Sequence, residues 1–148
     1  MTRAAAFLLA VALAVCAAGC GGGGDGGGEP PLGKQAYVAR AEAICAQGDA
    51  RLSAALQKEF PAGPPASKGA VEHATADIIV PALSEEVSRL RALPPPRGDE
   101  QRVAAIYDAM DSSLEAIKAD PKQTIVGDPF AKPQALADAY GLKKCGSG

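Results

Sequence analysis

The chain has 148 residues, of which 47% are hydrophobic and 22% are charged, and its formal net charge at pH 7 is −2. Proteins that bind nucleic acids need a surplus of Lys and Arg to meet the phosphates, so this mildly acidic balance argues against a nucleic-acid partner. Aromatic residues make up 4% and Trp is absent, which favours closely packed helices over a β-sandwich rich in β-branched and aromatic residues.

The first 19 residues have the layout of an export signal. Arg3 precedes an uninterrupted apolar run over residues 4–18, and Gly19 ends it, which is the order of segments in a secretory signal peptide. A membrane-spanning helix needs about 20 apolar residues, so this run is short for a span, and a retained anchor helix is the alternative. Cleavage after Gly19 leaves 14 basic and 17 acidic residues, a formal charge of −3.

The residues before Cys20 resemble the lipobox of bacterial lipoproteins. The sequence there is Ala17-Ala18-Gly19-Cys20, and in a lipobox small residues precede a Cys whose thiol takes a diacylglyceryl group before the signal is removed. The resemblance implies a lipid anchor at Cys20, on the outer face of the cytoplasmic membrane. The position three before the Cys is most often Leu and is Ala17 here. Simple cleavage after Ala18, which leaves Cys20 as a free thiol, is the alternative.

Glycines follow Cys20 and predict a flexible tether over residues 20–33. Seven of the eight residues from Gly21 to Gly28 are Gly, and a coil of this composition from Gly21 to Gly33 reaches on the order of 20 Å. Two or three acyl chains on Cys20 would make release from the membrane negligible. The tether leads into one domain, residues 34–148, which is long enough for one modest hydrophobic core.

Hydrophobic periodicity predicts two helices in the first half of this domain. The first covers residues 34–60 and ends at the prolines that follow. Its apolar face consists of Tyr37, Ala41, Ile44, Cys45, Gly48, Leu52, Ala55, Leu56 and Phe60. The second covers residues 67–93, and we expect it to kink near Val80 because Pro81 interrupts the backbone hydrogen bonds of its interior.

Two more helices are predicted in the second half. The third covers residues 99–119 and has the cleanest apolar face, and an irregular segment from 122 to 128 follows it. The last helix begins between Pro129 and Pro133 and ends at Gly141, with Leu142 as the hydrophobic contact of a Schellman ending. The sequence therefore predicts an all-α fold, a small up-and-down bundle of about four helices.

The four cysteines divide into two groups. Cys16 leaves with the signal and Cys20 carries the lipid, so Cys45 and Cys145 remain in a compartment that permits disulfides. Their bond would close a loop of about 100 residues, worth up to about 4–5 kcal/mol by the chain-entropy model. The alternative is a redox-active or metal-binding pair of thiols. The chain has no Cys-x-x-Cys spacing and no His at ligand spacing from a Cys.

Three segments carry a further resemblance. They are 37–45 (YVARAEAIC), 90–95 (LRALPP) and 139–146 (AYGLKKCG). In this order they resemble a pattern in small uncharacterised lipoproteins of high-GC actinobacteria. The resemblance implies an exported helical domain with a structural pair of cysteines, and it carries no activity over to this chain.

Two clusters of polar residues are candidate sites. His73 and Asp77 lie at i and i+4 of the second helix, where an acid can orient an imidazole as a base or metal ligand. Asp108, Asp111 and Glu115 form an acidic stripe whose oxygens could attract a divalent cation. The plainer interpretation of both clusters is a solvated helix face.

We expect no enzyme activity, no cofactor and no metal, because the sequence lacks a catalytic or phosphate-binding motif. Ser112 and Ser113 have no nearby His, and no Gly-x-Ser-x-Gly elbow occurs. The sequence favours a non-catalytic binding or scaffolding module for an envelope protein, a cell-wall polymer or a small apolar ligand. The alternative is a hydrolase-like enzyme with an unrecognised site near His73 and Asp77. A pocket lined by that pair would favour the enzyme, and an exposed apolar patch along the first or third helix would favour the binding module.

Overall fold

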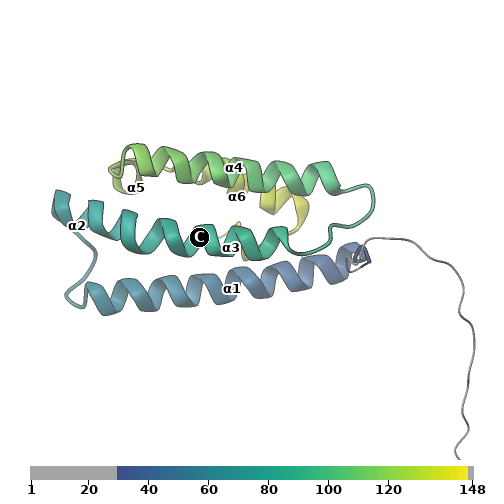
Figure 1. The fold of residues 1–148 in the computed structure, drawn as a ribbon, viewed down its shortest axis with the longest axis horizontal. Coiled ribbons are helices and arrows are strands. Elements are labelled where there is room, and N and C mark those ends of the chain that lie inside the picture. Colours follow the sequence, from purple (N-terminus) through teal and green to yellow (C-terminus); the bar gives the residue numbers. More distant parts are fainter. Residues whose placement is uncertain (1–29, 147–148) are drawn as a thin grey trace, which may run out of the picture.

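The computed structural model describes residues 30–146, which form an all-helical bundle (Figure 1). The predicted signal peptide and Cys20 lie outside the described residues. The helices are α1 (Lys34–Glu59), α2 (Lys68–His73), the π-helical segment η1 (Ala74–Ile79), α3 (Val80–Arg91), α4 (Glu100–Ala119), α5 (Gln123–Val126) and α6 (Ala131–Tyr140). The predicted all-α fold is confirmed. Over the described range, no helix combines the length and the apolar character that a membrane span requires.

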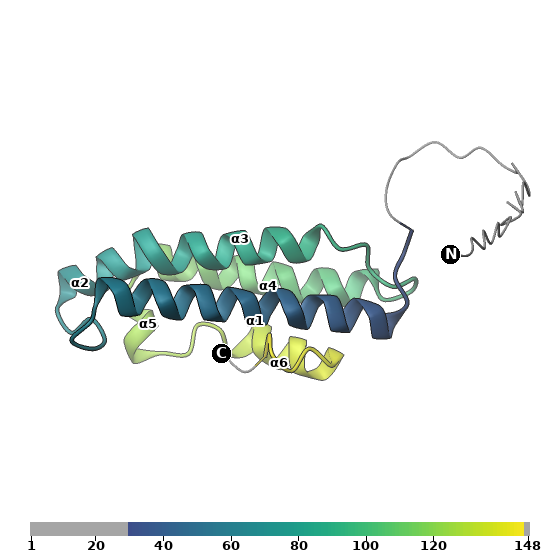
Figure 2. The same ribbon diagram turned by 90° about the horizontal axis from the view of Figure 1, so that it is seen from below.

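The long helices run side by side, and the loops gather at two ends of the bundle (Figures 1 and 2). α3 packs on both α1 and α4, and α6 packs on α4. The chain enters at the beginning of α1, and the α3–α4 loop, residues 92–99, lies at that same end, which we call the entry end. The α1–α2 loop, residues 60–67, and α5 lie at the opposite end, the far end. The 26 residues of α1 separate the two ends by about 39 Å, at 1.5 Å per residue.

α1 is uninterrupted because no proline occurs between Lys34 and Glu59. Its buried residues recur at steps of three and four, and they are Tyr37, Ala41, Cys45 and Gly48. Leu52 and Leu56, farther along the predicted apolar face, are only partly buried. The reason is that α6 and the chain end contact the entry half of α1, where the Tyr140 ring meets Tyr37 edge-on.

The irregularity predicted at Pro81 takes the form of a π-helical segment. Residues 68–91 are helical without a gap, but η1 replaces the α-helical pattern directly before Val80 and Pro81. The Val80 N–H donates to the carbonyl of Thr75, five residues back. Pro81 has no N–H, and its ring would clash with the carbonyl four residues back in a regular helix, so a wider turn accommodates it.

α4 and α6 match their predictions closely, whereas α5 was not predicted. α4 buries Val103, Ile106, Tyr107, Ala109, Ser113, Leu114 and Ile117. The segment 122–128, expected to be irregular, contains the single helical turn α5. That turn is too short to produce a hydrophobic period. It begins where the side chain of Asp120 accepts a hydrogen bond from the Lys122 N–H at 3.1 Å.

The end of α6 is the predicted Schellman motif. Gly141 has φ +110°, a left-handed conformation that residues with a side chain rarely adopt. The Leu142 N–H donates to the Ala137 carbonyl at 2.9 Å, and the Gly141 N–H lies 3.1 Å from the Asp138 carbonyl. Leu142 is 1% exposed, so its side chain anchors the chain end in the core.

A disulfide joins Cys45 of α1 to Cys145 of the chain end, as predicted. Cys45 belongs to the larger core cluster. That cluster consists of Tyr37, Ala41, Cys45, Val87, Leu90, Val103, Ile106, Tyr107, Ala137, Tyr140 and Leu142. The backbone N–H of Lys144 adds hydrogen bonds of 2.8 and 3.0 Å to the carboxylate of Glu42. The last residues are thus fixed to α1 by a covalent bond and by a charge-assisted contact.

Candidate functional site

The predicted pair of His73 and Asp77 is present, and a third residue joins it. His73 Nδ1 lies 2.8 Å from Asp77 Oδ2, and His73 Nε2 lies 3.1 Å from Glu59 Oε1 at the end of α1. The hydrogen bond to Asp77 and then the one to Glu59 raise the pKa of His73. With a carboxylate at each ring nitrogen, the imidazole is held as a donor on both sides, which is unlike a general base with a free nitrogen.

This cluster lies on the surface and not in a pocket. The side chains of His73, Asp77 and Glu59 are 45%, 66% and 51% exposed. Within residues 30–146, no three His, Cys, Asp or Glu side chains are placed to hold a metal ion. The far-end cavities are lined by other side chains. The cluster therefore links the end of α1 to η1 across the far end of the bundle.

Lysine and arginine neutralise the acidic stripe of α4. Arg91 Nη2 lies 3.1 Å from Asp108 Oδ1 and 2.6 Å from Asp111 Oδ2, and Lys118 Nζ lies 2.6 Å from Glu115 Oε1. All five side chains are 40% or more exposed. The stripe is thus a set of surface ion pairs, two from Arg91 of α3 to α4 and one within α4, in line with the interpretation of a solvated face.

Ser112 and Ser113 bond to the backbone. Ser112 Oγ donates to the Asp108 carbonyl at 2.8 Å. Ser113 Oγ is buried, 3.0 Å from the Ala109 carbonyl and 2.6 Å from the Pro129 carbonyl. Ser113 thus joins α4 to the segment before α6 and is not presented as a nucleophile.

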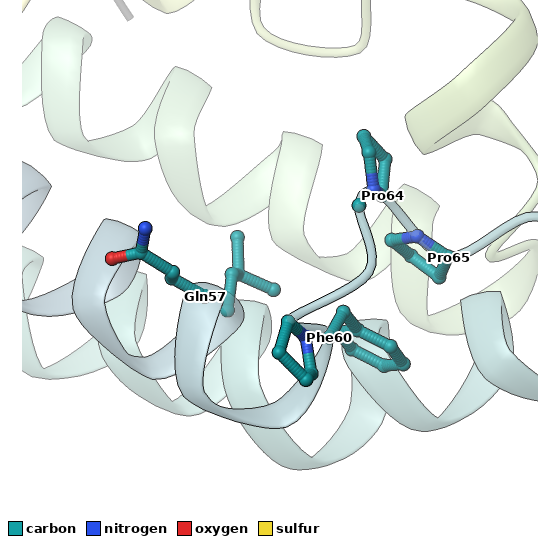
Figure 3. Close-up of a pocket in the computed structure, with 7 residues that line it drawn as sticks. Gln57, Phe60, Pro64 and Pro65 are labelled. Carbon is teal, nitrogen blue, oxygen red and sulfur yellow. The ribbon is translucent and has the colours of Figure 1, made fainter.

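The far end contains three adjoining cavities, which sequence analysis did not predict. The first, about 330 Å³, lies between the last turn of α1 and the proline-rich loop. Figure 3 shows Gln57 on the helix and Phe60, Pro64 and Pro65 along the chain that turns back from it. Its lining consists of Leu56, Gln57, Phe60, Pro61, Gly63, Pro64 and Pro65, and it contains no charged side chain.

The other two cavities continue this row toward α5. The second, about 220 Å³, shares Leu56, Pro64 and Pro65 with the first. The third, about 460 Å³, shares Val71 and Ile125 with the second and lies between α2, the end of α4 and α5. Only the third contains charged residues in its lining, and they are Lys68, Glu72, Asp120 and Lys122. The first and third cavities have the size of small-ligand sites, and all three linings are mainly apolar.

α5 places two large apolar side chains in solvent beside these cavities. Ile125 is 60% exposed and Val126 is 82% exposed, and both line the third cavity. An apolar patch that continues into cavities is typical of an interaction site. This patch lies on α5 at the far end, a turn that the sequence pattern did not reveal, and not along the first or third predicted helix, where a patch would have favoured the binding module. We call the three cavity linings together the far-end surface.

Thr75 connects the π-helical segment to the far-end surface. Its side chain lines the second cavity and is 1% exposed, and its hydroxyl has no hydrogen-bond partner in the described structure. Such a buried, unpaired hydroxyl costs about 1–3 kcal/mol. π-Helical turns occur frequently at functional sites. The π-helical segment sets this end of the bundle apart from the rest of the described fold.

Glu86 of α3 is a buried acid outside this surface. It is 7% exposed and packs against Gly48 of α1, where a side-chain β-carbon would lie 1.6 Å from Glu86 Oε2. Burial and, next, the charge of Asp49 raise the pKa of Glu86 to about 7, against smaller lowering effects of Arg51 and Arg89. The only sign of this contact in the sequence is a glycine on the buried face of α1.

The chain matches no protein-family model, no curated protein and no solved structure.

Proposed function

We propose that the chain is a lipoprotein anchored through Cys20 on the outer face of the cytoplasmic membrane, and that it is a non-catalytic binding module of the cell envelope. Its binding site would be the far-end surface. The observation that carries the proposal is the row of apolar cavities beside the exposed side chains of Ile125 and Val126. We assign it, by resemblance, to the small lipoproteins of high-GC actinobacteria.

The position of this surface suits a tethered module. A lipid on Cys20 would be joined through residues 20–33 to Lys34, the first residue of α1. The α1–α2 loop and α5, which contribute to the far-end surface, lie at the other end of that helix (Figure 1), about 39 Å away for 26 residues. The tether itself reaches on the order of 20 Å. The anchored domain could therefore present its far end to a ligand held several nanometres from the bilayer.

Site-specific photocrosslinking in living cells tests the binding site. A photoreactive amino acid at Val126, whose side chain is 82% exposed, should form covalent adducts with the bound component. The same amino acid at Glu85, whose side chain is 62% exposed on α3, serves as the control. Adducts from Val126 and not from Glu85 are expected. Equal yields from the two positions, or none from Val126, would contradict the proposed site.

Replacement of the anchor residue tests the proposed location. Cys20→Ala should release the protein from the membrane fraction into the medium, because no acyl chain is then attached. Cys16→Ala is the matched control, since Cys16 belongs to the predicted signal, and this variant should stay with the membrane. Persistence of the Cys20→Ala protein in the membrane fraction would refute lipid anchoring at this residue.

A further inference from the structure

We propose that the far-end surface binds an anionic amphiphile with a single acyl chain, which lies along the row of cavities with its anionic group beside Lys122. This inference rests on the proposed function and adds the chemical class of the ligand. A free fatty acid and a lysophospholipid share this chemistry.

The shape of the site favours a chain over a compact ligand. The cavities of about 330, 220 and 460 Å³ follow one another, and each neighbouring pair shares lining residues. Leu56, Pro64 and Pro65 join the first to the second, and Val71 and Ile125 join the second to the third. A flexible acyl chain can lie along such a row of adjoining cavities, whereas a compact ring system would fill one cavity and leave the others in contact with water.

The distribution of charge gives the ligand a direction. The first cavity contains no charged side chain and the second contains only the hydroxyls of Thr75 and Thr124 as side-chain polar groups. Charged side chains occur only in the third cavity. The apolar chain would therefore lie in the first two cavities and the polar head in the third.

The side chain of Lys122 favours a ligand whose polar head is anionic. Of the two cations in the third cavity, Lys68 is paired, with its Nζ 3.6 Å from Glu72 Oε1. The carboxylate of Asp120 accepts a hydrogen bond from the backbone N–H of Lys122. The ammonium of Lys122 takes part in no ion pair within residues 30–146. A carboxylate or phosphate on the ligand would supply its partner in a charge-assisted hydrogen bond.

The test compares ligands of equal chain length and different charge. The Cys20→Ala chain, secreted and soluble, is titrated below micelle-forming concentrations with dodecanoate, with dodecanol and with a dodecanoyl lysophosphatidic acid. Saturable binding of an anion, with dodecanol weaker by about tenfold, is expected from one charge-assisted contact. Whichever anion binds more tightly identifies the source of the head group, and either result supports the proposal.

Substitutions at the two ends of the site provide the controls. Lys122→Glu should weaken dodecanoate binding by about tenfold and leave dodecanol unchanged, because only the head loses its partner. Ile125→Asp should weaken both ligands. Lys58→Glu makes the same charge change at an exposed position of the far end that lines no far-end cavity, and it should change neither. Unaltered thermal unfolding of the three variants shows that each is folded.

Two results would overturn the ligand class. One is the absence of saturable binding of both anions to the parent chain. The other is a Lys122→Glu effect that is equal for dodecanoate and dodecanol. If neither anion binds while crosslinking at Val126 still captures an envelope component, the proposed ligand class is wrong and the proposal of a binding module is retained. If neither anion binds and Val126 also forms no adducts, both the ligand class and the proposed function are refuted.

Discussion

Replacing Cys45 and Cys145 together by Ala should lower the free energy of unfolding by about 3–5 kcal/mol. The bond spans 100 residues of sequence, and loops of that length restrict the unfolded chain by up to about 4–5 kcal/mol in the chain-entropy model. The total free energy of unfolding of a small domain is roughly 5–15 kcal/mol, so this loss would be a large share of the stability. Denaturant unfolding of the parent and the variant measures it.

Glu42→Gln is the control for this experiment. It weakens the contact between Glu42 and the Lys144 N–H while the disulfide stays intact, and it should cost about 1 kcal/mol or less. Thiol labelling of the exported, unreduced protein should also find Cys45 and Cys145 blocked. A loss below about 1 kcal/mol in the Ala variant, or two reactive thiols, would refute a structural role for the bond.

The second large effect is expected at Glu86, whose exchange for Gln should stabilise the domain above neutral pH. The folded-state pKa is about 7, against an ordinary 4.5. Because the folded pKa is the higher one, the contribution of Glu86 to stability is fully present below pH 4.5 and is lost as the pH rises to about 7. At about pH 8 the ionised carboxylate should cost roughly 2–3 kcal/mol, which Glu86→Gln would recover.

The pH dependence must be separated from that of His73, whose pKa is also raised. His73 likewise loses its stabilising effect as the pH rises, so both groups act in the same direction. The difference between the parent and Glu86→Gln, measured by denaturant unfolding from pH 4 to 8, isolates Glu86. Glu85→Gln is the matched control at the neighbouring exposed position and should leave the profile unchanged. A parallel profile for Glu86→Gln and the parent would contradict burial of a titrating acid.

Features set by local sequence could be predicted, whereas of the features set by distant contacts only the disulfide could be. Prolines end α1, and Gly141 with Leu142 ends α6, because each acts on its own turn of backbone. The disulfide could be predicted because Cys45 and Cys145 are the two cysteines that remain once Cys16 and Cys20 are assigned to the signal and the lipid anchor. Glu86 was missed because its burial depends on Gly48, 38 positions earlier on another helix.

The candidate site shows the same division. His73 and Asp77 are four residues apart and were predicted as a pair, but the second carboxylate, Glu59, is 14 residues from His73 and comes from α1. The far-end cavities form only where the proline-rich loop, η1 and α5 come together, and no single segment has a sequence pattern that predicts this arrangement. Ile125 and Val126 lie in a segment without hydrophobic period, so their exposure could be seen only in the structure.

The central claim is that the far-end surface, and not the histidine cluster, is where this protein acts. The most direct measurement places the photoreactive amino acid at Val126 in one strain and at Asp77 in another, since both side chains are well exposed. Adducts that form from Val126, and that Ile125→Asp reduces, are the predicted result. Adducts that form from Asp77 and not from Val126 would contradict the account and move the site to His73.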